Sequence, residues 1–329
     1  MRRLIRVSGL NNRRQVMASH TNPKSNIARI HLDERELYHS EGFWMRGFRR
    51  LRRDPLSMIS LSVLTVLVVI TVFAPLINNY ILKVDPNLTD PSIRLMRPFS
   101  AESIETGHLL GTDDLGRDYL GRLLQGGRIS LAIGFFGAVI TLAIGVSIGM
   151  VAGYFGGPVD DAINWAITTL DSIPSLYLLI LITVILRPSA QSLILVLALV
   201  GWTGGTRLMR GQTIALRHQE YIISAEALGA TPWRIMFVHI FPNLLSILTV
   251  VLTRGIGNLI LVESVLSFFS LGVLPPTPTW GNMLTNAQDF FRTGPHMATI
   301  SGLMIFITVL CLYVLGDGLR DAFDPELVD

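Results

Sequence analysis

Residues Tyr221–Asn243 read YIISAEALGATPWRIMFVHIFPN and separate two long apolar runs. This stretch predicts two short helices joined by a sharp turn at the membrane surface. Gly229 suits the left-handed conformation that ends many helices. Thr231 can cap the next helix, and Pro232 falls in the first helical turn, where a missing N–H is tolerated. Such a helical elbow would let a partner outside the bilayer push on a membrane protein.

Six apolar segments surround this elbow, and each is long enough to cross a hydrocarbon core, which takes about 20 helical residues. Half of the chain is hydrophobic (50% of 329 residues). The segments are Leu56–Ile77, Ile129–Phe155, Ala162–Leu186, Pro188–Thr206, Asn243–Val262 and Pro295–Gly316. We therefore predict an all-α polytopic membrane protein with six transmembrane helices.

The distribution of basic residues predicts the orientation. With the N-terminal segment inside, the internal segments carry 18 of the 27 Lys and Arg residues and the external segments carry 8. Cytoplasmic loops are enriched in these residues, so both termini are predicted to be cytoplasmic. Most of the formal net charge of +3 reflects this bias. A nucleic-acid partner is not indicated. Such binding would require a basic stretch with interleaved aromatic residues, whereas most of the excess positive charge here follows the membrane orientation.

Four parts are expected along the chain. Residues 1–41 are predicted to be a poorly ordered cytoplasmic tail, and residues 42–78 an interfacial segment followed by the first transmembrane helix. In the interfacial segment, FWMRGFRRLRR places aromatic rings beside cations, as suits the lipid headgroup region. Residues 79–128 form an external loop. Residues 129–329 form a five-helix core with a cytoplasmic loop at 207–242.

Missing motifs exclude several classes of function. Neither Lys24 nor Lys83 follows a glycine, so no GxxxxGK[ST] phosphate-binding loop exists in this sequence. HExxH and paired-cysteine metal motifs are also absent. The single cysteine, Cys311, excludes an internal disulfide. The sequence therefore predicts neither an enzyme nor a chain with its own cofactor or metal.

The segment that starts at Asp113 has the beginning of a calcium loop, with acidic residues at Asp114 and Asp118. The twelfth position is Leu124, whereas an EF-hand requires a bidentate glutamate there. We therefore predict a structural turn that leads into a helix.

Three ionisable residues fall within or beside the apolar segments: Asp171, Arg254 and Glu263. Such residues are costly in a bilayer and usually face the protein interior or a water path. Arg254 and Glu263 lie nine residues apart, on opposite faces of a helix, so their partners must come from other helices. A pairing of Asp171 with Arg254 is one expectation. These residues form either a buried ion pair or part of a translocation path.

A stripe of small residues recurs every four positions through the second apolar segment: Gly137, Thr141, Gly145, Gly149, Gly153 and Gly157. Small residues at this spacing allow close helix packing in membranes. A ligand-lined face is the alternative.

The elbow resembles the cytoplasmic loop of permease subunits of binding-protein-dependent ABC importers. Their pattern is Glu-Ala-Ala, three residues, Gly, nine residues, Ile-x-Leu-Pro, and Gly229 and Pro242 stand at the same spacing of 13. Ile223 replaces the glutamate and His239 replaces the isoleucine, while Phe241 occupies the leucine position. The peptide-type branch of the family often lacks that glutamate.

Four further segments resemble the C-type permease of dipeptide, oligopeptide and nickel importers. They are RRLRRDPLSM (49–58), HLLGTDDLGRDYLGRLLQGGRISLAIG (108–134), LGVLPPTPTWGNML (271–284) and GDGLRDAFDPEL (316–327). Together they extend the resemblance over residues 43–329.

The resemblance implies a type I permease fold in a bacterial or archaeal cytoplasmic membrane and the import of short peptides or related solutes. It also implies a second homologous permease, two ATPase subunits that hold ATP and Mg²⁺, and an extracytoplasmic solute-binding protein. The elbow residues that would couple to an ATPase are Ser224, Ala225, Glu226, Leu228, Gly229, Thr231, Pro232, Trp233 and Pro242.

The main alternative is a stand-alone secondary transporter or channel. That class predicts an inverted repeat, broken helices at the bilayer midplane and more buried carboxylates. The apolar segments show no such symmetry.

Overall fold

The computed structural model describes residues 43–186, 189–285, 287 and 289–323. The chain divides into a unit that ends at Arg46 and a compact unit that starts at Gly47. The prediction of a poorly ordered tail concerns residues 1–41, which lie outside the described residues. Within the described ranges the regular elements are helices only, with a single isolated bridge between Thr112 and Asp118.

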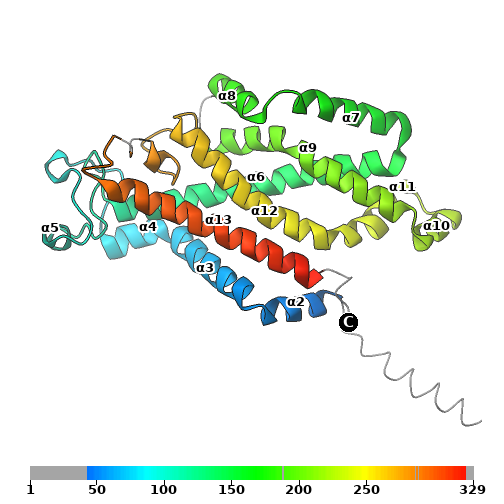
Figure 1. Ribbon diagram of the computed structural model, residues 1–329, viewed down its shortest axis with the longest axis horizontal. Helices are drawn as coiled ribbons and strands as arrows, with labels where there is room; N and C mark the ends of the chain where they lie inside the picture. Colours follow the sequence, from blue (N-terminus) through cyan, green and yellow to red (C-terminus); the bar gives the residue numbers. More distant parts are fainter. Residues whose placement is uncertain (1–42, 187–188, 286, 288, 324–329) are drawn as a thin grey trace, which may run out of the picture. The chain divides into compact units, whose positions relative to one another are not determined.

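The helices, shown in Figure 1, have the following bounds. The long ones are α3 (Pro55–Val72), α6 (Tyr119–Phe155), α9 (Ala190–Arg217), α12 (Phe241–Phe268) and α13 (Pro295–Phe323). The intermediate ones are α2 (Phe43–Arg53), α7 (Gly157–Asp171), α8 (Ser175–Ile185) and α10 (Glu220–Ala227). The short ones are α4 (Ala74–Leu76), η2 (Ile77–Leu82), η3 (Pro91–Ile93), α5 (Ala101–Glu105), α11 (Pro232–Arg234), η4 (Ile235–Ile240) and η5 (Asn282–Leu284).

Helices α6 and α9 make the most extensive contact of any helix pair in the described residues and run side by side (Figure 1). Glycines of the small-residue stripe face α9: a Cβ on Gly145 would lie 3.1 Å from the Thr206 nitrogen, and one on Gly149 would lie 2.7 Å from the Thr206 oxygen. A Cβ on Gly153 would lie 2.7 Å from the Arg210 oxygen. The expected role of the stripe in helix packing is confirmed for these three glycines, because only glycine permits this backbone approach.

A second group of helices packs beside this pair. Helix α12 contacts both α6 and α13, and α3 lies against α13. The core at the loop-bearing end of this group contains Tyr119, Trp280, Met297 and Ile260. The Tyr119 hydroxyl donates to the Met297 oxygen at 2.6 Å, and the Trp280 indole N–H donates to the Leu123 oxygen at 3.0 Å. These bonds attach the first turn of α13 and the Pro-rich loop between α12 and α13 (residues 269–294) to the start of α6.

Among the described residues, five helices are long and apolar enough to span a membrane, and a sixth span arises if α7 and α8 count as one. The sequence predicted the third span, Ala162–Leu186, as one helix, and this is wrong. Helices α7 and α8 are bent by 82° relative to each other. Pro174 precedes α8. Its ring clashes with a preceding helical turn and its nitrogen cannot donate, so the helix breaks there.

Two predicted boundaries also move. Helix α6 begins at Tyr119, ten residues before the predicted start at Ile129, because the Asp118 carboxylate caps it by accepting from the Gly121 N–H at 2.5 Å. Helix α9 continues to Arg217, past the predicted end at Thr206. These two helices are thus longer than their apolar segments.

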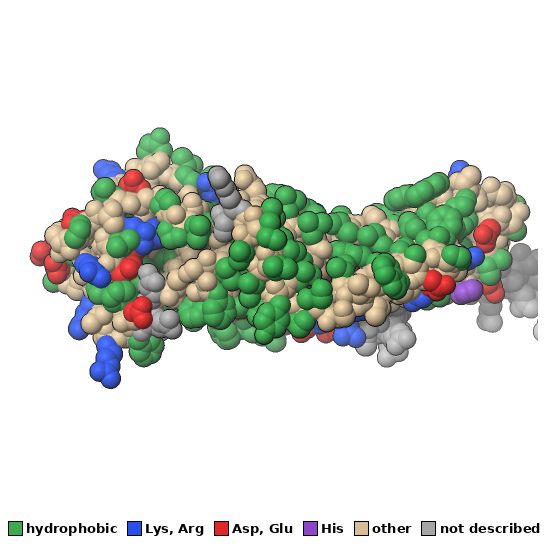
Figure 2. Space-filling view, turned by 90° about the horizontal axis from the view of Figure 1, so that it is seen from above, with side chains coloured by type: hydrophobic (Ala, Val, Ile, Leu, Met, Phe, Trp, Pro, Cys, Tyr) green, Lys and Arg blue, Asp and Glu red, His purple; other side chains and the backbone are tan. Residues whose placement is uncertain are grey.

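The surface agrees with a membrane location. On the face shown in Figure 2, hydrophobic side chains cover the middle of the bundle, and most of the visible charged side chains gather toward its two ends. Exposed large hydrophobics occur on α3, α6, α8 and α13, including Val66, Phe136, Val184 and Phe306. An exposed apolar belt of this kind suits contact with lipid.

Candidate functional site

The elbow ends α10 with a Schellman motif. Gly229 has φ 84°, the left-handed conformation that the sequence predicted. Its N–H donates to the Glu226 oxygen at 2.9 Å, and the Ala230 N–H donates to the Ala225 oxygen at 3.1 Å. These two bonds satisfy carbonyls that the helix end would otherwise leave open. The sharp turn at Gly229 is confirmed.

The chain after the turn starts a new helix as predicted. The Thr231 hydroxyl accepts from the Arg234 N–H at 3.4 Å, and Pro232 occupies the first turn. The second helix is not short, however, because α11, η4 and α12 form one continuous span from Pro232 to Phe268. Any force on the elbow therefore reaches α12 directly through helical backbone.

One face of the elbow is anchored in the bundle. Ile222, Ile235, Met236 and Ile240 are almost fully buried. They share a core with residues of α6 and α9, such as Met209. This core fixes the position of the elbow on the bundle.

The other face of the elbow is open. Leu228 is 90% exposed, and Trp233, also exposed, stacks on Phe237 with ring centroids 6.0 Å apart. Of the predicted coupling residues, Ser224, Glu226 and Pro242 are exposed, while Ala225 is half-buried. The exposed Leu228 side chain and the exposed Trp233–Phe237 pair give the elbow apolar surface that is suited to a protein partner.

The three predicted charges do not form one cluster. The expected pairing of Asp171 with Arg254 is wrong: Asp171 pairs with Arg207 of α9, with Oδ2 2.5 Å from the arginine Nη2. Arg254 instead pairs with Asp317 of α13. Each arginine thus finds its partner on the helix beside it, which sequence separation does not reveal.

Glu263 is fully buried and pairs with hydroxyls. Its carboxylate accepts from the Ser267 hydroxyl at 2.7 Å and from the Ser130 hydroxyl at 3.4 Å. No ion pair of Glu263 occurs among the described residues. The Ser130 hydroxyl oxygen also accepts from the backbone N–H of Trp280 at 3.1 Å, so this group links α6, α12 and the Pro-rich loop.

Sequence analysis missed a second ion pair between α7 and α9. The Arg210 guanidinium contacts both carboxylate oxygens of Asp160, and its Nη2 lies 2.5 Å from Oδ2. Asp160 also accepts from the Asn164 amide at 2.8 Å. The three-residue spacing of Arg207 and Arg210 was the available signal, because it places both on one face of a helix.

A cavity of about 350 Å³ lies beside the Asp171–Arg207 pair. Its polar lining includes Ser175, Thr203 and Asn258, and the rest is mainly apolar. The side chains of Arg207 and Asp171 remain 51% and 34% exposed. The pair is therefore accessible to a molecule that enters the cavity.

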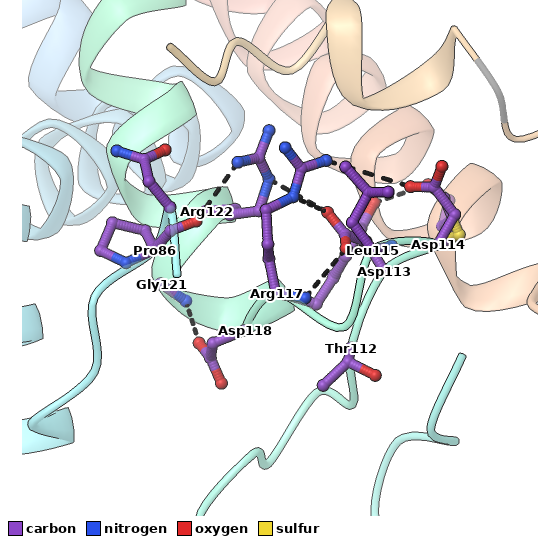
Figure 3. Close-up of polar contacts among 12 residues, drawn as sticks. Pro86, Thr112, Asp113, Asp114, Leu115, Arg117, Asp118, Gly121 and Arg122 are labelled. Atoms are coloured by element: carbon purple, nitrogen blue, oxygen red, sulfur yellow. Dashed lines mark hydrogen bonds and ion pairs between the residues drawn. The ribbon is translucent and has the colours of Figure 1, made fainter. Parts of the chain in front are cut away.

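At the opposite end from the elbow, the Asp113 segment forms the predicted structural turn (Figures 1 and 3). The Asp113 carboxylate accepts from the N–H groups of Leu115 and Arg117 at 2.9 and 3.0 Å. It also binds the Arg117 guanidinium at 2.7 Å and lies 3.4 Å from Nε of Arg122. Gly116 completes the turn with φ 73°. These contacts occupy Asp113 with structural partners.

Comparisons with known proteins agree with this architecture. The family described as binding-protein-dependent transport system inner membrane component matches residues 145–329. The N-terminal TM domain of oligopeptide transport permease C matches residues 42–98. Between them the two matches include the elbow, the broken third span and the first span.

Named relatives cover most of the chain. The dipeptide transport system permease protein DppC of Alkalihalophilus pseudofirmus is 38% identical over 86% of this chain and 90% of its own length. The oligopeptide transport system permease protein OppC of Bacillus subtilis is 34% identical over 88% and 91%. The glutathione transport system permease protein GsiD of Pectobacterium atrosepticum is 40% identical over 69% and 75%.

These matches decide between the two classes of transporter. The α7–α8 break is a feature expected of a secondary transporter. The family match nevertheless spans the break and the elbow together. The chain belongs to the family of binding-protein-dependent transport system inner membrane components, and it is a multi-pass inner-membrane permease subunit of an ABC importer.

Proposed function

We propose that this subunit translocates short peptides or closely related solutes. The support is the set of relatives, which are named for dipeptide, oligopeptide and glutathione transport. These solutes are chemically related, because each contains peptide-like amides and charged ends. The family implies an ATPase and a solute-binding protein as partners.

In this proposal the chain pairs with a second homologous permease, and two ATPase subunits bind the cytoplasmic face. ATP and Mg²⁺ are held by those subunits, and this chain carries no cofactor. Both termini and the elbow lie in the cytoplasm, and the Asp113 turn lies outside. The placement is supported by the positive-inside bias of the sequence and by the position of the elbow opposite that turn (Figure 1).

The structure of the elbow is the main support for the proposed coupling to an ATPase. Its buried face is fixed to α6 and α9, its open face presents Leu228 and Trp233, and its second half continues as α12. An ATPase that binds this open face more tightly in one conformation of the permease than in another shifts the permease toward that conformation. Helix α12 transmits the movement because it shares a continuous backbone with the elbow.

The experiment compares Gly229→Val with Gly229→Asn in the complete transporter, reconstituted with its partner subunits. A Cβ at Gly229 meets no atom within 4 Å, so a side chain fits and only the backbone conformation is tested. Valine in the left-handed region costs about 1–2 kcal/mol, whereas asparagine tolerates it. We expect Gly229→Val to lower peptide uptake and substrate-stimulated ATP hydrolysis about tenfold.

Gly229→Asn is the matched control and is expected to keep both activities. Full uptake and full stimulated ATP hydrolysis by Gly229→Val would contradict the role of the elbow. A complete wild-type transporter that fails to take up di- and tripeptides would contradict the proposed substrate class instead.

A further inference from the structure

The Asp171–Arg207 ion pair is partly exposed and lines the cavity of about 350 Å³. Both residues belong to candidate membrane spans, with Asp171 at the end of α7 and Arg207 within α9. Both side chains are substantially exposed, at 34% and 51%. Charged side chains in a membrane span are costly against lipid and face protein or water. The pair therefore meets a water-filled path or another protein.

The neighbouring pair of the same two helices behaves differently. Arg210 binds Asp160 through two nitrogens, and Asn164 donates to the same carboxylate. The Arg210–Asp160 side chains are less exposed, at 31% and 14%. A bidentate, hydrogen-bonded pair already attaches α7 to α9. The single contact between Arg207 and Asp171 is therefore not needed to hold the two helices together, and these two charges can also interact with a ligand.

The cavity beside the pair has the size and lining of a small-molecule site. Its volume of about 350 Å³ lies in the range of about 300–1,000 Å³ that is usual for ligand pockets. Asn258, Thr203 and Ser175 add hydrogen-bonding groups to an otherwise largely apolar wall. The site thus offers one cation, one anion and neutral polar groups around a single space.

We propose that Arg207 and Asp171 bind the two charged ends of a zwitterionic solute as it passes, with Arg207 on its carboxylate and Asp171 on its ammonium group. In the empty path the two side chains pair with each other, and the solute separates them. This exchange keeps both charges compensated in each state, which matters because an unpaired charge in a membrane protein is costly. The inference rests on the proposed function, since peptides carry both ends.

The first test measures uptake by the reconstituted complete transporter, with unblocked Ala-Ala and Ala-Ala-Ala as probes and saturating binding protein. Asp171→Asn and Arg207→Gln are expected to lower uptake per assembled complex about tenfold or more, as the loss of a charged hydrogen bond would. Asp160→Asn and Arg210→Gln are the matched controls, and uptake per assembled complex should stay within about twofold of wild type.

The second test reads occupancy of the cavity, which a purely structural pair would not affect. Asn258→Cys is introduced with Cys311, the single native cysteine, replaced by alanine. During turnover unblocked Ala-Ala should slow the reaction of the new thiol with a charged thiol reagent. This protection should disappear with Asp171→Asn or Arg207→Gln and persist with Asp160→Asn.

The outcomes are separable. Normal uptake, or retained protection, in the Asp171 and Arg207 variants overturns the inference while the proposed function stands. Absence of peptide uptake by the wild-type transporter overturns the proposed function, and the zwitterion site falls with it. Loss of uptake and of protection in these variants alone supports the inference.

Discussion

Arg254 of α12 forms an ion pair with Asp317 of α13, and its aliphatic stem packs on the neighbouring Gly316. A Cβ on Gly316 would lie 3.0 Å from Cγ of Arg254. The glycine therefore makes room for the arginine, and the carboxylate one residue later neutralises it. This contact joins two of the membrane-spanning helices, because the arginine of α12 needs the space and the opposite charge that α13 provides.

A double-mutant cycle tests this contact. Arg254→Gln and Asp317→Asn should each destabilise the subunit, and the double variant should lose less than their sum. The expected coupling is about 0.5–1 kcal/mol, because both side chains are partly exposed and exposed pairs contribute little. Reversible unfolding in mixed micelles measures it. Strictly additive effects would show that the pair is energetically silent.

The packing of α6 on α9 predicts opposite effects at two helical glycines. Gly149→Ala places a Cβ 2.7 Å from the Thr206 oxygen, so the helices must separate, at a cost of about 1–3 kcal/mol. Gly211→Ala is the control: its Cβ meets no atom within 4 Å, and alanine should stabilise α9 by about 0.5–1 kcal/mol. Thermal denaturation of the purified transporter compares them. Equal melting temperatures for both variants would refute the packing argument.

The buried carboxylate of Glu263 predicts a difference between two substitutions. Glu263→Gln keeps an oxygen that can accept from the Ser267 hydroxyl, whereas Glu263→Ala leaves a cavity and unpaired hydroxyls. We expect the alanine variant to lose about 2–4 kcal/mol and the glutamine variant to lose less. Chemical denaturation gives the values. Similar losses in both variants would mean that hydrogen bonding at this position is unimportant.

The cap of α3 predicts a dependence on pH. Asp54 accepts from the N–H groups of Leu56 and Ser57 and from the Ser57 hydroxyl. The Ser57 hydroxyl is the main cause that lowers the pKa of Asp54 below its usual 3.8. Asp54→Ala should therefore cost about 1 kcal/mol at neutral pH.

The sign of this dependence follows from the lowered pKa. Ionised Asp54 stabilises the folded state above the unfolded pKa, and the contribution is lost as the pH falls through the lower folded pKa. The stability difference between wild type and Asp54→Ala should accordingly shrink below about pH 4. Unfolding free energies of wild type and Asp54→Ala, measured between about pH 3 and 7, would detect this decrease. A difference that stays constant with pH would exclude the ionised cap.

We predict that an ATPase subunit contacts the open face of the elbow. Leu228→Asp adds a charge where Leu228 is almost fully exposed, so folding should be unaffected while ATPase binding weakens. Leu88→Asp is the matched control, because Leu88 is also exposed but belongs to the predicted external loop. Co-purification with the ATPase subunits is the measurement. Equal recovery with both variants would place the contact elsewhere.

Local features were the ones that sequence reasoning predicted well. The turn at Gly229 and the cap at Thr231 depend on residues within about six positions, so their backbone preferences are sufficient. The break at Pro174 was missed because hydropathy continues across it. The start of α6 was predicted too late, at Ile129, because its cap, Asp118, lies outside the apolar segment.

The sequence by itself determined the helical class, the candidate spans, the elbow and the family resemblance, since each depends on composition, periodicity or short motifs. Only the tertiary structure decided that Asp171 pairs with Arg207 and Arg254 with Asp317, and that Glu263 is enclosed by hydroxyls. The partners are 36 and 63 positions apart along the chain. Charge attraction acts on distance in space, and helix packing sets that distance.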